Sequence, residues 1–196
     1  MIRRLSGREV YRNRWLSLRE DQVERDDGST GIYSVVDKPP MAIVLPLDET
    51  ADGVGVWLVE QYRYTLGRRV WELPQGAYED GPDLPGVELA RQELREETGL
   101  SAGRMDQLAV LQVAYGFCAQ PMHAFVGRDL TPGEHAREQT EQDMVVDRVP
   151  LARFEQMLLS GEIVDSLTHA TYGAWLLRSR RGGALLDCPS EVSAWQ

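Results

Sequence analysis

The stretch from Gly76 to Leu100 constrains the fold of this chain more than any other segment. Residues 86–98 carry an apolar stripe at helical spacing, and the opposite side of the predicted helix is rich in charge. Gly99 follows the last turn, where a left-handed helix C-terminus favours glycine. The segment therefore predicts one amphipathic helix, entered through a glycine and closed by another.

Three glutamates share one face of this predicted helix. Glu93, Glu96 and Glu97 stand at i, i+3 and i+4, so their carboxylates lie about one turn apart. Like charges this close repel one another and destabilise the helix unless a cation binds them. Hard oxygen ligands such as carboxylates suit Mg²⁺, with Mn²⁺ as a substitute. The spacing indicates a divalent metal site, and a purely solvated acidic face is the alternative for the bare pattern.

Composition limits the class of partner. The 196 residues carry a formal net charge of −10, which disfavours nucleic acid as a partner because phosphate backbones bind basic surfaces. The sequence has no apolar run of the ~20 residues that a membrane helix needs, and no signal peptide is expected. Cys118 and Cys188 are too few for a disulfide framework, so a cytoplasmic location is expected.

The remaining pattern mixes strands and helices without regular βαβ order, so the predicted class is α+β. An N-terminal β unit at 1–39 is expected to end at Pro39-Pro40, followed by a main domain at 40–178 and a tail at 179–196. The N-terminal unit is expected to be a small antiparallel sheet across residues 11–36. Strands are predicted at 41–47, 54–59, 70–74, 108–114, 123–126 and 144–146, loops at 48–53 and 129–142, and helices at 151–159 and 166–178.

Gly76 and the segment from Gln92 to Leu100 resemble the signature of the Nudix hydrolases, Gly-x5-Glu-x7-Arg-Glu-U-x-Glu-Glu-x-Gly-U, where U is aliphatic. The resemblance implies a Nudix α/β/α sandwich and hydrolysis of a nucleoside diphosphate linked to another group. Two departures stand out. Gln92 occupies the arginine position, and 93 − 76 = 17 steps separate Gly76 from Glu93, two more than in the motif. The first glutamate of the motif has no clear counterpart.

Further segments are similar to the ADP-ribose pyrophosphatase branch of the family. That branch implies a homodimer in which the N-terminal sheet is exchanged between subunits, and hydrolysis of ADP-ribose to AMP and ribose 5-phosphate. A downstream proline frequent among these hydrolases is absent, since the corresponding region reads Ala114-Tyr115-Gly116-Phe117. The segments that carry the resemblance are 11–18, 59–64, 71–76 and 161–165.

The resemblance also implies roles for individual residues. Glu93, Glu96 and Glu97 would bind the metal together with the backbone carbonyl of Gln75, and Glu97 would be essential for catalysis. A glutamate in the acidic loop before the last strand would act as the general base. Glu141 is the first choice for this base and Glu138 the second, and the alternative is an acidic loop with no catalytic duty.

Three residues are candidates for substrate contacts. Arg63 would meet the adenosine or phosphate region, and Trp15 of the partner chain would stack on the adenine. Tyr33 stands where relatives can have a substrate-contacting arginine. Sheet packing for Trp15 and an ordinary salt bridge for Arg63 are the structural alternatives.

Two other functions are compatible with the sequence. The chain could hydrolyse another nucleotide sugar or a dinucleotide, because Tyr33 and the missing proline weaken ADP-ribose as the specific substrate. A catalytically weak domain that binds a nucleotide as a sensor would explain Gln92 and the missing first glutamate. A Nudix-fold isomerase is disfavoured, because the metal and base residues match hydrolases better.

Overall fold

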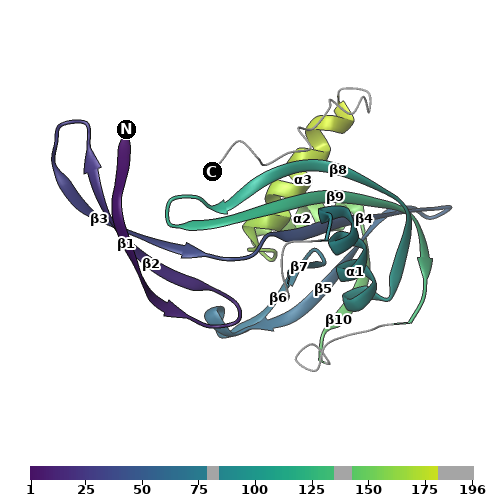
Figure 1. The fold of residues 1–196 in the computed structure, drawn as a ribbon. Coiled ribbons are helices and arrows are strands. Elements are labelled where there is room, and N and C mark those ends of the chain that lie inside the picture. The colour runs from purple at the N-terminus through teal and green to yellow at the C-terminus, as the bar shows by residue number, and fades with distance from the viewer. Residues whose placement is uncertain (79–83, 135–142, 181–196) are drawn as a thin grey trace.

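The computed structural model describes residues 1–78, 84–134 and 143–180. The chain forms ten strands, three α-helices and one 3₁₀ turn within those ranges (Figure 1). In chain order the elements are β1 (Ile2–Arg12), β2 (Ser17–Arg25), β3 (Thr30–Asp37), β4 (Met41–Thr50), β5 (Gly53–Arg63), η1 (Tyr64–Leu66), β6 (Arg68–Glu72), β7 (Gln75–Ala77), α1 (Gly86–Thr98), β8 (Leu100–Ala114), β9 (Cys118–Pro132), β10 (Val145–Pro150), α2 (Leu151–Ser160) and α3 (Ser166–Arg180).

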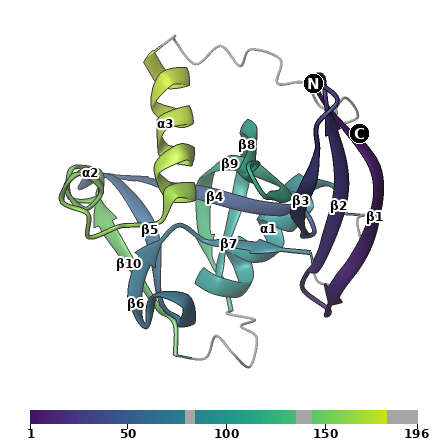
Figure 2. The same ribbon diagram turned by 90° about the vertical axis from the view of Figure 1, so that its left-hand side faces the viewer.

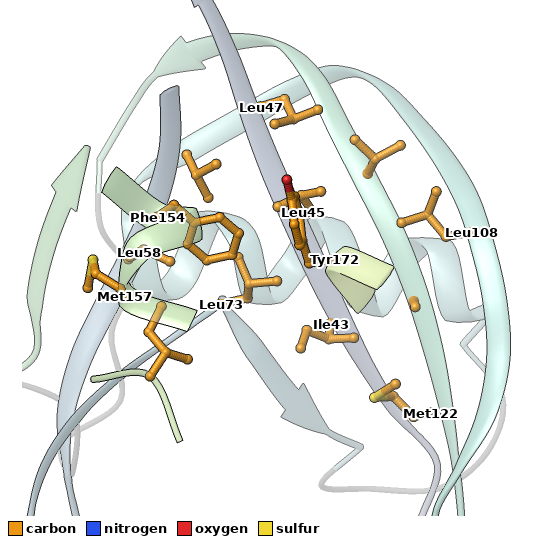
Figure 3. Packing of buried hydrophobic residues seen from close by; sticks show 14 of the residues in the cluster. Ile43, Leu45, Leu47, Leu58, Leu73, Leu108, Met122, Phe154, Met157 and Tyr172 are labelled. Atoms are coloured by element: carbon orange, nitrogen blue, oxygen red, sulfur yellow. The ribbon is translucent and has the colours of Figure 1, made fainter. Parts of the chain in front are cut away.

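Strand β4 lies at the centre of the molecule and is buried on both faces. Successive side chains of a strand point to opposite faces, so its apolar run serves two separate cores. Ala42 and Val44 pack with the apolar side of α1. Ile43, Leu45 and Leu47 pack with α2 and α3 on the other face, as Figure 3 shows. The predicted α+β class with helix layers on both faces of a sheet is therefore confirmed (Figure 2).

The strands form one branched sheet with the order β1-β2-β3-β9-β4-β5-β10. Most neighbours are antiparallel, whereas β9 runs parallel to β3 and to β4. Strand β7 pairs with the first residues of β4, with Ala42 opposite Gly76. Strand β6 pairs with β5, which continues into the other half of the sheet. This branching brings β5, β6 and β7 together beside α1.

Helix α1 has the bounds that the sequence predicts. Its apolar stripe, Leu89, Ala90 and Leu94, is buried against the sheet. Gly99 ends the helix in the left-handed region (φ 73°), and its N–H donates to the carbonyl of Arg95. A side chain at this φ would be strained, so the glycine fixes where the glutamate face stops.

The N-terminal strands stand to one side of the central layers (Figures 1 and 2). The predicted hairpin is present as β2 and β3, which turn at Gly28 (φ 79°). Strand β1, which the sequence pattern does not reveal, pairs with β2 and is exposed at every residue. An exposed strand has no apolar alternation to mark it, and hydrogen bonding to β2 alone defines it.

Two predicted loops are shorter in the structure than expected. Strands β4 and β5 reach Thr50 and Gly53, so the predicted loop at 48–53 shrinks to a tight turn. The predicted loop at 129–142 is wrong at its start, because β9 continues to Pro132 opposite Leu100. Long antiparallel pairing extends these polar residues into strands, since their outer face meets water.

Helices α2 and α3 cover the second core with the side chains of Phe154, Met157 and Tyr172 (Figure 3). The rings of Phe154 and Tyr172 meet edge to face, with their centroids 5.2 Å apart. The two helices agree with the predicted ranges within two residues at each end. Throughout the described ranges, no helix is both long and apolar enough to cross a membrane.

Candidate active site

A cleft of about 600 Å³ opens between α1 and the strands beside it. One wall is acidic and comes from α1. A second wall is basic and aromatic and comes from the β1–β2 turn, the segment after β3, and β5. The floor is β7. The lining residues are Arg14, Trp15, Lys38, Pro39, Gln61, Arg63, Gln75, Gly76, Ala77, Tyr78, Leu84, Leu89, Gln92, Glu93, Glu96 and Glu97.

The acidic wall holds all three helix glutamates of the predicted metal site. Glu97 is the deepest, with only 1% of its surface exposed. The backbone N–H of Gln75 donates to its Oε2 over 3.0 Å. A carboxylate buried to this degree needs compensating donors, so the β7 main chain fixes Glu97 toward the cleft. The predicted metal ligand Gln75 lies on the cleft floor beside it.

Glu93 lies directly over Gly76. A Cβ atom built on Gly76 would come within 2.4 Å of the Glu93 carboxylate carbon and both its oxygens. Heavy atoms do not approach this closely without displacement, so only glycine leaves room for the carboxylate. Gly76 therefore makes a cradle that places Glu93 against the main chain of β7.

Gln92 takes part in the same wall through Glu96. Its Nε2 donates to Glu96 Oε1 over 3.1 Å, one helical turn away. A neutral amide thus supports this glutamate at the position where the Nudix signature has arginine. Because the amide is neutral, this hydrogen bond does not compensate the negative charge of Glu96 as an arginine would.

The donor set fits a divalent cation by its chemistry. Three carboxylates and the β7 main chain offer hard oxygen ligands from one side of one cleft. Within residues 1–78, 84–134 and 143–180, no three acidic, histidine or cysteine side chains already stand close enough together to hold an ion. The residues fit Mg²⁺ by their type and by lining one cleft, and Gly76 leaves room for the carboxylate of Glu93, one of the predicted ligands.

The basic wall is built around Arg63. The Arg63 guanidinium pairs with the Glu72 carboxylate through Nε at 3.1 Å and through Nη2. Gln61 donates its amide to the same carboxylate over 2.8 Å. Burial raises the pKa of Glu72, and the contacts with Arg63 oppose that rise. Arg63 therefore forms a salt bridge, as the structural alternative expects. It also lines the cleft, so a substrate contact is compatible with that salt bridge.

Trp15 lies in the β1–β2 turn at the mouth of the cleft. The turn is closed by Asn13, whose side-chain oxygen accepts the backbone N–H groups of Trp15 and Leu16, each at 2.9 Å. The Arg14 guanidinium lies 4.3 Å from the centroid of the Trp15 ring, and Lys38 lines the cleft nearby. Trp15 lines the cleft of its own chain, so the expected exchange between subunits is not required to bring it there.

A buried network supports the floor from α3. Asp165 caps α3 by accepting the N–H and the hydroxyl of Thr168, at 2.8 and 2.7 Å. It also accepts the side-chain amide of Gln75 over 3.0 Å, while Thr168 accepts the N–H of Leu73 over 3.0 Å. Leu73 and Gln75 flank the turn into β7, so α3 fixes the strand that carries the cradle.

The sequence pattern did not single out Glu72, Gln61, Arg14 or Asp165. Glu72 had one available signal, because it is a charged residue inside an otherwise apolar extended segment, which favours a buried partner. Asp165 also had one, since Asp-x-x-Thr before an apolar run is typical of a helix start. Only the strand pairing shows which partner each of them meets.

The remaining predicted residues lie elsewhere. Tyr33 does not line the cleft of its own chain, and its hydroxyl donates to the carbonyl of Gly116 over 2.6 Å. That contact ties β3 to the β8–β9 turn. Glu138 and Glu141, the predicted bases, lie outside the described residues. Their roles stay predictions.

Comparison with known proteins gives two family matches. A model described as the nucleoside diphosphate sugar hydrolase N-terminal domain matches residues 2–36, and the NUDIX domain model matches residues 37–166. A solved structure described as an ADP compounds hydrolase has a TM-score of 0.77 and 20% identity, and the match covers 93% of this chain and 95% of that one. This likeness confirms the predicted Nudix sandwich.

Relatives with different functional names match most of the chain. An ADP-ribose pyrophosphatase of Mycobacterium tuberculosis (strain ATCC 25618 / H37Rv) is 32% identical over 167 residues, which are 85% of this chain and 79% of the relative. A methanol dehydrogenase activator of Bacillus methanolicus is also 32% identical, over 82% of this chain and 84% of its own length. Relatives of this sequence thus carry more than one kind of functional name.

Proposed function

Because this chain belongs to the Nudix hydrolase family and is a Nudix pyrophosphohydrolase, we propose that it hydrolyses ADP-ribose to AMP and ribose 5-phosphate with Mg²⁺. One observation carries the proposal. A single cleft has three carboxylates on one wall and Arg63 with Trp15 on the other. Such a cleft can bind a diphosphate between a metal site and a cationic side chain, with an aromatic ring beside the adenine of the substrate.

The acidic wall supplies the metal site in this proposal. Glu93, Glu96 and Glu97, with the carbonyl of Gln75, would hold Mg²⁺. When bound, Mg²⁺ neutralises charge on the phosphate oxygens and lowers the pKa of an attacking water. The chain's own part is to hold the carboxylates in place, through the cradle at Gly76 and the N–H that Gln75 donates to Glu97.

The basic wall supplies substrate binding. Arg63 would donate hydrogen bonds to the phosphate or adenosine region, and the planar guanidinium suits phosphate oxygens. Trp15 would stack on the adenine with one face, while Arg14 lies against its ring at 4.3 Å. Tyr33 would contribute only by fixing the β8–β9 turn or by reaching a second subunit. Glu141, or else Glu138, would accept the proton of the attacking water.

Choice of substrate within this class is the finer part of the proposal. ADP-ribose is favoured because an ADP-ribose pyrophosphatase is among the relatives that match most of the chain. Another nucleotide sugar or a dinucleotide is the second candidate. Two sequence features favour this second candidate: Tyr33, and a region at 114–117 that lacks the proline. The two lie close together, because the Tyr33 hydroxyl donates to the carbonyl of Gly116.

The proposal includes that the protein is a homodimer and that it acts in the cytoplasm. The first strand is exposed at every position, and apolar side chains such as Ile2, Leu5 and Val10 are about half exposed. Apolar side chains on a strand at the edge of a sheet are a surface that a second copy can cover. Light scattering of the purified chain would measure its mass, and a monomer at all concentrations would contradict the dimer.

The proposal is tested by a hydrolysis screen with and without Mg²⁺ and Mn²⁺. Substrates are ADP-ribose, GDP-mannose, NADH, diadenosine polyphosphates and 8-oxo-dGTP. Wild-type protein is expected to release AMP from ADP-ribose faster than nucleotide from the others. Glu97→Gln is expected to lose about 10³-fold in kcat, since metal charge stabilisation is worth several kcal/mol. Glu88→Gln, an exposed acid on the same helix outside the cleft, is the matched control.

Each outcome of the screen decides between the candidates. If the wild type prefers a different diphosphate, ADP-ribose is the wrong substrate and the proposed reaction class still holds. Full activity of Glu97→Gln would exclude the metal assignment. Nucleotide binding without turnover of any diphosphate would support the sensor and overturn the proposed hydrolysis.

A further inference from the structure

We propose that Glu72 is a positioning residue, which holds Arg63 and Gln61 as one preassembled unit on the substrate side of the cleft. The inference rests on the proposed function of the cleft and goes beyond it. It concerns a residue that does not itself line the cleft and that stands behind two residues that do.

The geometry places one buried carboxylate behind two half-buried donor side chains. Glu72 is on β6 opposite Val59 of β5, and only 2% of its surface is exposed. Gln61 and Arg63 follow Val59 at two-residue steps, so all three side chains point to the same face of β5. Glu72 accepts one amide hydrogen bond from Gln61 and two hydrogen bonds from Arg63.

The pairing fixes the orientation of Arg63 before substrate arrives. A guanidinium has five N–H donors in a rigid fork. Glu72 engages donors on Nε and Nη2, so the donors that this carboxylate does not use are the ones that would meet a ligand in the cleft. A side chain that is already ordered loses less freedom on binding, which increases affinity.

Burial disfavours the charged form of Glu72. Burial is the largest effect on this carboxyl and raises its pKa, and the neighbouring Asp165 raises it further. Arg63 and Gln61 lower it again without cancelling the effect of burial. A buried carboxylate needs donors that compensate its charge, and Arg63 and Gln61 supply three of them. The same contacts hold both donor side chains beside the cleft, which is the positioning role proposed here.

The test uses Glu72→Gln, which keeps the size of the side chain and removes its charge. With ADP-ribose as substrate we expect KM to rise about tenfold and kcat to stay within about twofold, because binding is lost without loss of chemistry. In an Arg63→Ala background, Glu72→Gln should cause no further rise in KM, since its effect acts through Arg63. Asp48→Asn, which removes the carboxylate from a cross-strand pair with Arg148 outside the cleft, is the matched control.

A second measurement needs no substrate. The Arg63 Nε–H signal in an NMR spectrum is expected to be protected from solvent exchange in the wild type and to lose that protection in Glu72→Gln. Arg63→Lys, which keeps the charge without the fork, should raise KM as Glu72→Gln does, and it serves if Glu72→Gln fails to fold. If the wild type hydrolyses no substrate, the proposed function is wrong. The NMR comparison still tests the role of Glu72, because it needs no turnover.

Three results would overturn the inference. One is an equal rise in KM when Glu72→Gln is added to Arg63→Ala. Another is an unchanged Arg63 signal in Glu72→Gln. The third is an unchanged KM for Arg63→Lys.

Discussion

The two walls of the cleft are built in opposite ways. The acidic wall comes from one helix, where Glu93, Glu96 and Glu97 are neighbours in the sequence and on the helix surface. The basic wall comes from three separate segments, represented by Trp15, Lys38 and Arg63. Helical geometry alone assembles the first wall, whereas sheet pairing across long sequence distances assembles the second.

The two walls also differ in the groups that hold their side chains in place. Glu97 and Glu93 meet main-chain features of β7, a backbone N–H and a glycine without a side chain. Arg63 is fixed by another side chain, the carboxylate of Glu72. A wall fixed by main chain tolerates few changes near it, while a wall fixed by side-chain pairs can be altered by conservative substitution. Four predictions test this contrast.

Gly76→Ala should give the largest effect, because the new methyl group would overlap the Glu93 carboxylate at 2.4 Å. The end of a glutamate side chain can move aside, so the protein should fold. A displacement near 1 Å at a reacting centre costs about 10²-fold, and we expect a loss of that size in kcat. Steady-state kinetics and a thermal melt measure the two properties.

The control for this variant is Gly173→Ala on α3, where a Cβ would meet no atom within 4 Å. It should keep full activity and gain slightly in melting temperature, since alanine favours helix. Full activity of Gly76→Ala would show that the main chain of β7 does not fix the acidic wall.

Trp15→Ala should act on binding alone. Stacking of a base on an aromatic side chain is worth about 1–3 kcal/mol, so KM should rise by about tenfold or more with kcat little changed. The KM of Trp15→Phe should stay close to that of the wild type, because phenylalanine keeps an aromatic face. A fall in kcat at constant KM would assign Trp15 to the chemistry, and the division of labour between the walls would be wrong.

Gln92→Ala should weaken the metal site without destroying it. The variant removes the 3.1 Å hydrogen bond to Glu96 and preserves helix propensity. Loss of a residue that orients a metal ligand typically costs about 10–100-fold in metal affinity, and we expect the lower end because Gln92 is exposed. Titration of activity and of direct binding with Mg²⁺ measures the change.

Gln92→Arg is the comparison variant, because it restores a donor of the kind that the family signature has. It should keep or improve the Mg²⁺ affinity of the wild type. Equal affinities for Gln92→Ala and the wild type would show that Glu96 needs no support from its own helix.

The smallest effect concerns stability and pH. The pKa of Glu72 is raised by burial, so the folded protein favours the protonated carboxyl more than the unfolded chain does. The stability that this group contributes is fully present below the ordinary pKa of a glutamate and is lost as pH rises through the higher folded pKa. Glu72→Gln has no such loss.

The melting temperature of Glu72→Gln should therefore equal that of the wild type in acid and exceed it slightly near neutral pH. Thermal melts of both proteins across this range measure the difference. A lower melting temperature for Glu72→Gln at neutral pH would mean that the Arg63 ion pair stabilises the fold, contrary to the direction that burial sets.

Local pattern was sufficient for some elements and insufficient for others. The helix at 86–98 and the helices near 151–159 and 166–178 were predicted because apolar periodicity and end signals are local. Strand β1 was missed, because every one of its residues is exposed and only pairing with β2 defines it. The start of the predicted loop at 129–142 was wrong for a similar reason, since pairing with β8 extends β9 to Pro132.

The sequence by itself determined the acidic wall, because residues at i, i+3 and i+4 of a helix share a face wherever that helix lies. It also determined the family, through the segment from Gly76 to Leu100. Only the tertiary structure decided that Trp15 reaches the cleft of its own chain and that Tyr33 does not. It also decided that Glu72 stands behind Arg63. Those placements depend on which strands pair and in which register, and side-chain contacts between distant strands have no local signature in the sequence.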